Sequence, residues 1–272
     1  MRSLCAMTMI LIVVLLPGCS VTDIHGHYQT TKAKIFLLAM RPGNYFEEEQ
    51  LALVKAARRC DESKLSELVA EGADLDGMGV DGMTPLTWMV VKHNYRGLTC
   101  LLEAGATPDY QAEIEYYGQR TYVTALEYAV AMRDTRYMKA LLESGADPAL
   151  SINPVSGTPV VYSAILAGRV ENIEILIDHG FDINHVSKFG STAITRAARM
   201  NKFQIALWLY EHGADPSLTD ETAPSPSSAL DSIKRYGAAG VNRWSKDVGA
   251  YHELVNRLVE DGYLDEAPPS RL

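Results

Sequence analysis

The chain has 272 residues, of which 47% are hydrophobic and 22% are charged. This length allows one large domain, two small ones or a repeat array, and the apolar content is sufficient for a buried core, which excludes an intrinsically disordered protein. Lys and Arg number 25 against 34 Asp and Glu, which gives a net charge of −9. Phosphate backbones repel such a chain, and the sequence shows no local basic face, so we expect no nucleic-acid partner.

Residues 1–18 have the pattern of a targeting segment. Arg2 supplies a positive start, and an apolar run from Met7 to Leu16 follows it. The run is about as long as the hydrophobic region of a signal peptide and is too short for a membrane-spanning helix. It ends in Leu16-Pro17-Gly18-Cys19, a tetrad that resembles the lipobox of bacterial lipoproteins.

The lipobox resemblance implies cleavage before Cys19, acylation of its thiol and of the new amino group, and anchoring of the mature chain. Several acyl chains, at roughly 0.8 kcal/mol for each buried methylene, hold a protein stably at a bilayer. Ser20 follows the cysteine, where the resemblance associates Asp with inner-membrane retention. We therefore expect a lipid-anchored protein on the periplasmic side of the outer membrane. An ordinary cleaved signal peptide with an incidental cysteine is the alternative.

Two sequence marks recur along the chain with a period of about 33 residues. The first contains a glycine and is found at Gly72, Gly105, Gly145, Gly180 and Gly213, with a weaker copy at Gly262. The second is a Thr-Pro-Leu-Thr tetrad or a variant of it, beginning at Thr84, Thr124, Thr192 and Ser228. Because the three threonines each precede their glycine by 21 residues, the marks indicate a structural repeat.

The two marks resemble the ankyrin repeat, in which a TPLH-like tetrad is followed by two antiparallel helices and a glycine-containing turn. The resemblance implies an all-α solenoid of about five to six helix pairs with β-hairpin connections. Thr84-Pro85 suits a helix start, and Asp81-Gly82 suits a tight hairpin. The tetrad histidine of the family is absent, which puts the family's usual hydrogen bonds between repeats in doubt. The tetrad of the fourth repeat begins at Thr158 or, one residue later, at Pro159.

The marks divide the chain into a signal peptide (1–18), a lipidated tether and N-terminal docking segment (19–47), the repeat domain (48–264) and a tail (265–272). Repeats are expected near 48–75, 76–108, 109–148, 149–183, 184–216 and 217–264. The first lacks the tetrad and is expected to cap the array, with helices around 51–54 and 65–68 and the apolar segment 34–40 docked on it. The last has a surplus loop, which we place at 236–240, before a closing helix around 254–258.

Four cysteines are too few for a disulfide scaffold of this length. Loss of the signal removes Cys5, and acylation uses Cys19, so Cys60 and Cys100 remain as thiols in an oxidising space. These two residues fall at different helical phases of neighbouring repeats. We therefore favour buried packing thiols over a disulfide.

Residues suited to catalysis do not converge in the sequence. His179 and His212 share one repeat position, which the repeat itself explains, and His25 and His27 lack a further metal ligand. The motifs of serine hydrolases, phosphate-binding loops and zinc peptidases are absent. We therefore expect no enzyme, no catalytic residue, no cofactor and no bound metal.

The residue after each tetrad faces a concave groove in ankyrin repeats. The resemblance gives this position to Trp88, Tyr128 and Arg196, with Ser163 in the shifted register of the fourth repeat. Aromatic side chains and arginine dominate binding hot spots, so the first three are candidate protein-binding residues. The alternative is that Trp88 and Tyr128 pack on each other.

The connection between Asp109 and Val123 is about seven residues longer than the period requires and is rich in tyrosine. Tyrosine offers a large contact area at a low entropic cost. We expect this hairpin to contact a basic or mixed partner surface, and the alternative is that it folds onto its neighbours. Its candidate binding residues are Tyr110, Glu113, Glu115, Tyr116, Tyr117, Arg120 and Tyr122.

Taken with the compartment, the repeats predict a lipid-anchored periplasmic module that binds another protein and meets the membrane through Cys19 alone. Bacterial proteins similar to it include immunity proteins that neutralise secreted effectors directed at membranes, such as lipases. An anchored inhibitor would lie where such a toxin acts. The alternatives are an envelope scaffold that supports a resident enzyme or assembly factor and, from another class, an unrecognised hydrolase.

Overall fold

The computed structural model describes residues 41–116, 119–151, 158–223, 226–239 and 247–268, without the side chains of residues 114–116, 119–121, 123 and 236–239. The predicted signal peptide, Cys19 and the apolar segment 34–40 lie outside the described residues. The chain divides into two compact units, Met1–Asp147 and Pro148–Leu272, which we call the N-terminal and the C-terminal unit.

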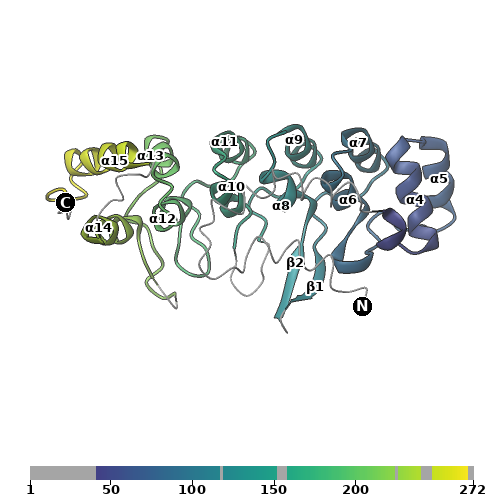
Figure 1. Ribbon diagram of the computed structural model, residues 1–272, viewed down its shortest axis with the longest axis horizontal. Coiled ribbons are helices and arrows are strands. Elements are labelled where there is room, and N and C mark those ends of the chain that lie inside the picture. Colours follow the sequence, from purple (N-terminus) through teal and green to yellow (C-terminus); the bar gives the residue numbers. More distant parts are fainter. Residues whose placement is uncertain (1–40, 117–118, 152–157, 224–225, 240–246, 269–272) are drawn as a thin grey trace. The chain divides into compact units, whose positions relative to one another are not determined.

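Helix pairs build the N-terminal unit, and they have the all-α repeat architecture that the sequence predicts. Helices α6 and α8 lie side by side in one layer, and α7 and α9 lie in a second layer (Figure 1). Leu98, Leu126 and Leu141 are fully buried. The elements are η1 (Pro42–Asn44), α4 (Glu48–Arg59), α5 (Glu62–Ala70), η2 (Val80–Gly82), α6 (Pro85–Val91), α7 (Tyr95–Glu103), β1 (Ala112–Tyr116), β2 (Gln119–Val123), α8 (Ala125–Val130) and α9 (Arg136–Glu143).

The C-terminal unit repeats this two-layer arrangement. Helices α10, α12 and α14 form one layer, and α13 packs on both α12 and α15. The elements are α10 (Val161–Ala167), α11 (Val170–Asp178), α12 (Ala193–Arg199), α13 (Phe203–Glu211), α14 (Ala229–Ala239) and α15 (Val248–Glu260). The predicted closing helix is α15, whereas the placement of the surplus loop at 236–240 is wrong, because α14 continues to Ala239. Among the described residues, no helix has the length and apolar character needed to cross a bilayer.

Hydroxyl groups of the tetrads cap the first helices of the repeats. The Oγ1 of Thr84 accepts a hydrogen bond from the Thr87 backbone N–H at 3.1 Å, and Thr124 and Thr192 cap α8 and α12 in the same way. These bonds satisfy backbone donors that have no partner within the helix. The predicted helix start at Thr84-Pro85 is confirmed, with the proline in the first turn.

Left-handed backbone conformations mark the turn after the second helix and, in several repeats, the turn between the two helices. The glycine after the second helix is left-handed, with φ of 103° at Gly72 and 95° at Gly213, as expected for a residue without a Cβ. The turn between the two helices uses Cys60, His93, Gly168 and Asn201, with φ between 50° and 70°. Gly168 precedes Asn201 by 33 residues, so Pro159 aligns with Thr192 and the shifted register of the fourth repeat is the correct one.

Hydrogen bonds between repeats pass through the fourth residue after the turn glycine. Asp76 Oδ1 accepts from the backbone N–H of Thr107 at 2.9 Å. Asn184 Oδ1 accepts from the Asp215 backbone N–H at 2.8 Å, and Asn184 Nδ2 donates to the Gly213 carbonyl at 3.3 Å. Bonds between repeats are therefore present without the tetrad histidine.

A disulfide joins Cys60 to Cys100, with 5.6 Å between their Cα atoms. Our preference for packing thiols is therefore wrong. The argument from helical phase fails because Cys60 lies beyond the last residue of α4, in the left-handed conformation. The bond ties the end of the first helix of the capping repeat to the second helix of the next repeat.

Candidate functional site

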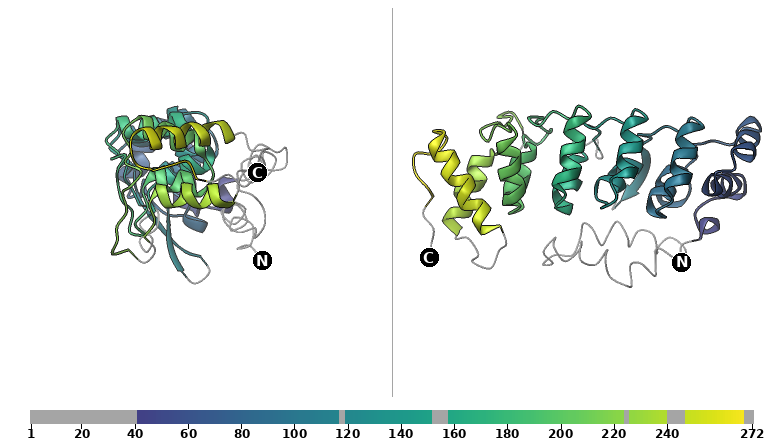
Figure 2. Two further views of the ribbon diagram at one scale, coloured as in Figure 1. Left: turned by 90° about the vertical axis from the view of Figure 1, so that its left-hand side faces the viewer. Right: turned by 90° about the horizontal axis from the view of Figure 1, so that it is seen from above.

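The long connection in the third repeat forms a two-stranded antiparallel ribbon, as the sequence predicts. Ala112 lies opposite Val123, and Glu113 lies opposite Tyr122. The ribbon projects beyond the helices of the N-terminal unit, as Figures 1 and 2 show. Because residues that face each other across two strands share a side of the ribbon, positions 113, 115, 120 and 122 lie on one side of it.

The structure describes the side chains of only some of the hairpin residues that the sequence predicts to bind a partner. Glu113 is exposed and Tyr122 is half-buried. Glu115, Tyr116 and Arg120 lie in the strands, but their side chains are outside the description, as is Tyr117 entirely. Tyr110 precedes β1, and 39% of its surface is exposed.

Three large side chains are exposed at neighbouring loops of the N-terminal unit, and we call Met78, Val80 and Tyr110 the hairpin patch. Met78 is 52% exposed and Val80 is 48% exposed. Strand β1 contacts η2, which contains Val80, and the bond from Thr107 to Asp76 joins the bases of the two loops. Grouped apolar side chains in contact with solvent are typical of interaction sites.

Sequence reasoning found Tyr110 but missed Met78 and Val80. Both lie just before the Asp81-Gly82 turn, whose two residues have the positive φ values of 57° and 72° that a tight hairpin requires. Apolar residues within three positions before such a turn can stay exposed, as Met78 and Val80 do. That position is the signal that could have identified them.

Trp88 is buried, so its predicted role as a groove-facing binding residue is wrong. Only 1% of its surface is exposed. The rings of Tyr45 and Phe46 pack on it at centroid distances of 5.5 and 5.7 Å, and the Val80 backbone N–H donates to the Tyr45 carbonyl at 2.8 Å. The described end of the N-terminal docking segment thus covers the groove position of the second repeat. Tyr128, at the same position of the third repeat, is half-buried.

Arg196 occupies the groove position of the fifth repeat and is half-buried. Its guanidinium carbon lies 5.3 Å from the ring centroid of Tyr162, a cation–π geometry. The Tyr162 hydroxyl donates to the Ser191 carbonyl at 2.7 Å, which fixes the ring. Ser163, at the same position of the preceding repeat, is half-buried.

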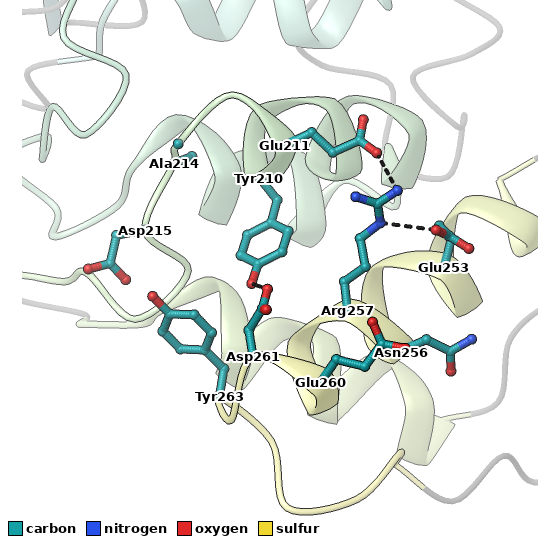
Figure 3. A pocket seen from close by; sticks show the side chains of 11 residues that line it. Tyr210, Glu211, Ala214, Asp215, Glu253, Asn256, Arg257, Glu260, Asp261 and Tyr263 are labelled. Carbon is teal, nitrogen blue, oxygen red and sulfur yellow. Dashed lines mark hydrogen bonds and ion pairs between the residues drawn. The ribbon is translucent and has the colours of Figure 1, made fainter.

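A pocket of about 820 Å³ lies between α13 and α15 (Figure 3). Arg257 reaches Glu211 at 2.9 Å and Glu253 at 3.0 Å, and the Tyr210 hydroxyl donates to Asp261. Burial and the bond to Asp261 raise the pKa of Tyr210. The Arg257–Glu211 and Tyr210–Asp261 pairs connect α13 to α15 and its C-terminal end, whereas Arg257–Glu253 lies within α15, so the groups of this pocket stabilise the packing of α15 on α13.

Glu127 is the fourth residue of the tetrad in the third repeat and lies in the first turn of α8. Burial raises the pKa of its carboxyl to about 7. The group therefore changes charge near neutral pH. In the part of the chain that the structure describes, no three side chains of His, Cys, Asp or Glu gather as a metal site would require.

Comparison with known proteins assigns the repeat. Residues 126–220 match the family model of ankyrin repeats in three copies. These residues are ankyrin repeats. The ankyrin-repeat fold serves protein interaction and is generally without enzymatic activity.

Several curated proteins are similar to part of the chain. Protein PhlB of Serratia liquefaciens is 30% identical over 152 residues, which are 56% of this chain and 63% of PhlB. SH3 and multiple ankyrin repeat domains protein 2 of Homo sapiens is 30% identical over 156 residues, 57% of this chain and 8% of that protein. The mitochondrial disaggregase of Bos taurus is 29% identical over 141 residues, 41% of this chain and 21% of that protein. The chain thus spans less than two thirds of each relative.

Proposed function

We propose that the protein is a lipid-anchored binding module that neutralises a toxic secreted effector outside the cytosol, in the manner of an immunity protein. The coarser part of this statement, a protein-binding module, follows from the ankyrin repeats. The observation that carries the proposal is the hairpin patch beside the projecting ribbon.

The hairpin patch has the chemistry of a protein-binding surface. Met78, Val80 and Tyr110 are large, and each is more than a third exposed. Their removal from water on contact with a partner is favourable in proportion to the apolar area covered. Glu113, exposed on the adjacent ribbon, adds a negative charge at the margin of the patch. The combination suits a partner that presents an apolar centre with basic residues around it.

Two features support a location outside the cytosol. The tetrad that ends at Cys19 resembles a lipobox and is preceded by an apolar run. The disulfide between Cys60 and Cys100 is of a kind that persists in oxidising compartments such as the periplasm and is rare in the cytosol. The two features are independent, since one concerns export and the other the folded repeats.

The anchor is the reason to favour a membrane-directed toxin, such as a lipase, as the partner. Several acyl chains would hold the repeats at the surface of the bilayer. An inhibitor confined there meets a membrane-acting enzyme at a high local concentration, because both are restricted to the same surface. An envelope scaffold would share the anchor, but its loss would not sensitise the cell to a neighbour.

Competition between neighbouring cells tests the proposal. Cells that lack the protein should lose survival beside siblings that deliver secreted effectors, and the wild-type chain should restore it. The double variant Val80→Asp/Tyr110→Asp should fail to restore survival. The matched control is Val69→Asp, since Val69 is 37% exposed on α5 and lies outside the hairpin patch. Equal survival of cells with and without the protein would contradict the immunity role and leave the scaffold as the alternative.

A further inference from the structure

Repetition places three arginines together in the first-helix layer of the C-terminal unit. Arg196 and Arg199 lie one turn apart on α12, and Arg235 lies on α14. Arg199 and Arg235 are each the seventh residue after the start of their tetrads at Thr192 and Ser228. Since α12 and α14 pack side by side (Figure 1), these arginines form what we call the basic strip.

Among the described residues, the arginines of the basic strip form no ion pair, although the charge of Asp231 interacts with that of Arg235. The cations of the ion pairs seen elsewhere in the described part include Lys64, Arg136 and Arg257. The lack of an ion pair at the strip is notable because acidic residues outnumber basic residues by nine in the sequence. Charged side chains taken from water are usually paired.

The charged side chain of Arg196 is also partly buried. Its Nε atom is buried and has no hydrogen-bond partner among the described residues. Burial lowers the pKa of Arg196, Tyr162 raises it, and the neighbouring Arg199 lowers it. A guanidinium nevertheless remains protonated in proteins. Its Nε–H is therefore a donor that this part of the chain leaves unused.

The surroundings of Arg196 hold it in place without a carboxylate. Tyr162 is 8% exposed, and its hydroxyl is fixed by the Ser191 carbonyl at 2.7 Å. Ser191 itself is 4% exposed, and its Oγ also has no partner among the described residues. A guanidinium that stacks on a fixed ring is preorganised, so little conformational freedom is lost when it binds.

We propose that Arg196 binds a carboxylate of an acidic side chain on the protein partner, with Arg199 and Arg235 as flanking cations. This inference rests on the proposed function, because it assigns the chemistry of the partner at the second surface. A planar guanidinium matches a carboxylate with two parallel N–H···O bonds. A phosphate on a lipid surface is the competing anion, and the vesicle arm of the experiment below distinguishes it from a carboxylate.

Binding of an acidic peptide to the full chain tests the site. The probe is an acetylated, amidated hexaglutamate peptide, and the readout is the Nε–Hε resonance of Arg196 together with the dissociation constant. We expect a saturable shift of this resonance and about tenfold weaker binding for Arg196→Ala, in line with a charge-assisted bidentate bond. Arg196→Lys should keep the charge but lose most of the affinity, because it lacks the planar fork.

Arg96→Ala is the matched control, since Arg96 is exposed on α7 and its loss changes the net charge equally. It should alter the affinity less than twofold. An unshifted Arg196 resonance in the wild-type chain, or equal weakening by Arg96→Ala, would overturn the proposal without any need for the Arg196 variants to fold. Tighter, Arg196-dependent binding to phosphatidylglycerol vesicles than to the peptide would also overturn it in favour of a phosphate site. Arg196-dependent peptide binding with unchanged cell competition would remove the immunity role but leave the carboxylate site standing.

Discussion

Trp88 and Arg196 occupy the same position of two ankyrin-type repeats, four residues after the first residue of the tetrad, yet their surroundings are opposite. Trp88 in the N-terminal unit is covered by Tyr45 and Phe46. Arg196 in the C-terminal unit stays half-buried on one tyrosine ring. A repeat position therefore supplies a location, and the segments that pack over it decide whether its side chain stabilises the fold or meets a partner.

Removal of the indole is the strongest way to test this contrast. Trp88→Ala should lower the free energy of unfolding by about 3–5 kcal/mol, because it opens a cavity beneath Tyr45 and Phe46. Chemical denaturation measures the change. A loss below about 1 kcal/mol would mean that the covering segment is not held by Trp88.

The disulfide between Cys60 and Cys100 stabilises the N-terminal unit, and its removal should have the second-largest effect. Replacement of Cys60 and Cys100 by serine should cost about 2–4 kcal/mol of stability, since the bond closes a loop across 40 residues. Thermal unfolding with and without a reductant measures it. The reductant should destabilise the wild-type protein and leave the double variant unchanged. A shift of equal size in both would show that the bond contributes nothing.

Glu127 should make the N-terminal unit sensitive to pH. Its pKa is about 7 in the folded protein and near 4.5 when solvated, so the folded state binds the proton more tightly. The stability contributed by this group is complete below pH 4.5 and is lost as pH rises through 7, in total about 3 kcal/mol. Glu127→Gln should therefore be more stable than wild type at pH 8 and should remove this part of the pH dependence. Parallel stability curves from pH 5 to 8 would contradict the expected titration.

A substitution at Gly79 tests how closely the segment that contains Tyr45 and Phe46 packs against the loop before α6. A Cβ at this residue would meet the Tyr45 carbonyl oxygen and would lie 2.9 Å from a ring carbon of Phe46. Gly79→Ala should lower stability by about 1–3 kcal/mol and shift Trp88 fluorescence toward that of exposed tryptophan. Gly249→Ala is the control, because a Cβ there has no atom within 4 Å among its described surroundings. Equal effects of the two substitutions would argue against the contact.

The smallest effect on folding is expected at Arg196. Arg196→Ala should lower the free energy of unfolding by no more than about 1 kcal/mol, because the substitution loses the cation–π contact with Tyr162 but no ion pair among the described residues. Denaturation beside Trp88→Ala gives the comparison directly. A large loss at Arg196 would make it a structural residue like Trp88.

The repeat architecture could be predicted from the sequence because its marks have local physical causes. Thr84 and Thr192 cap helices, and Gly72 and Gly213 adopt the left-handed turn; neither property depends on distant residues. The register of the fourth repeat needed Gly168, whose conformation shows where its first helix ends.

The candidate site was less predictable because it depends on which segments meet. Nothing in the local sequence of Trp88 shows that Tyr45 and Phe46, about forty residues earlier, cover it. Nor does the spacing of Arg199 and Arg235 indicate a shared surface until α12 and α14 are seen to be neighbours. The Cys60–Cys100 bond was missed because Cys60 was counted as part of a helix that ends one residue before it.

The turn between paired helices accepts four different residues, Cys60, His93, Gly168 and Asn201, in one backbone conformation. Such tolerance means that a cysteine can be placed there without reshaping either helix. A covalent brace can therefore be added to this scaffold at any repeat where a second thiol comes within reach. Natural or engineered disulfides could therefore stabilise the array one repeat at a time without changing its binding surfaces.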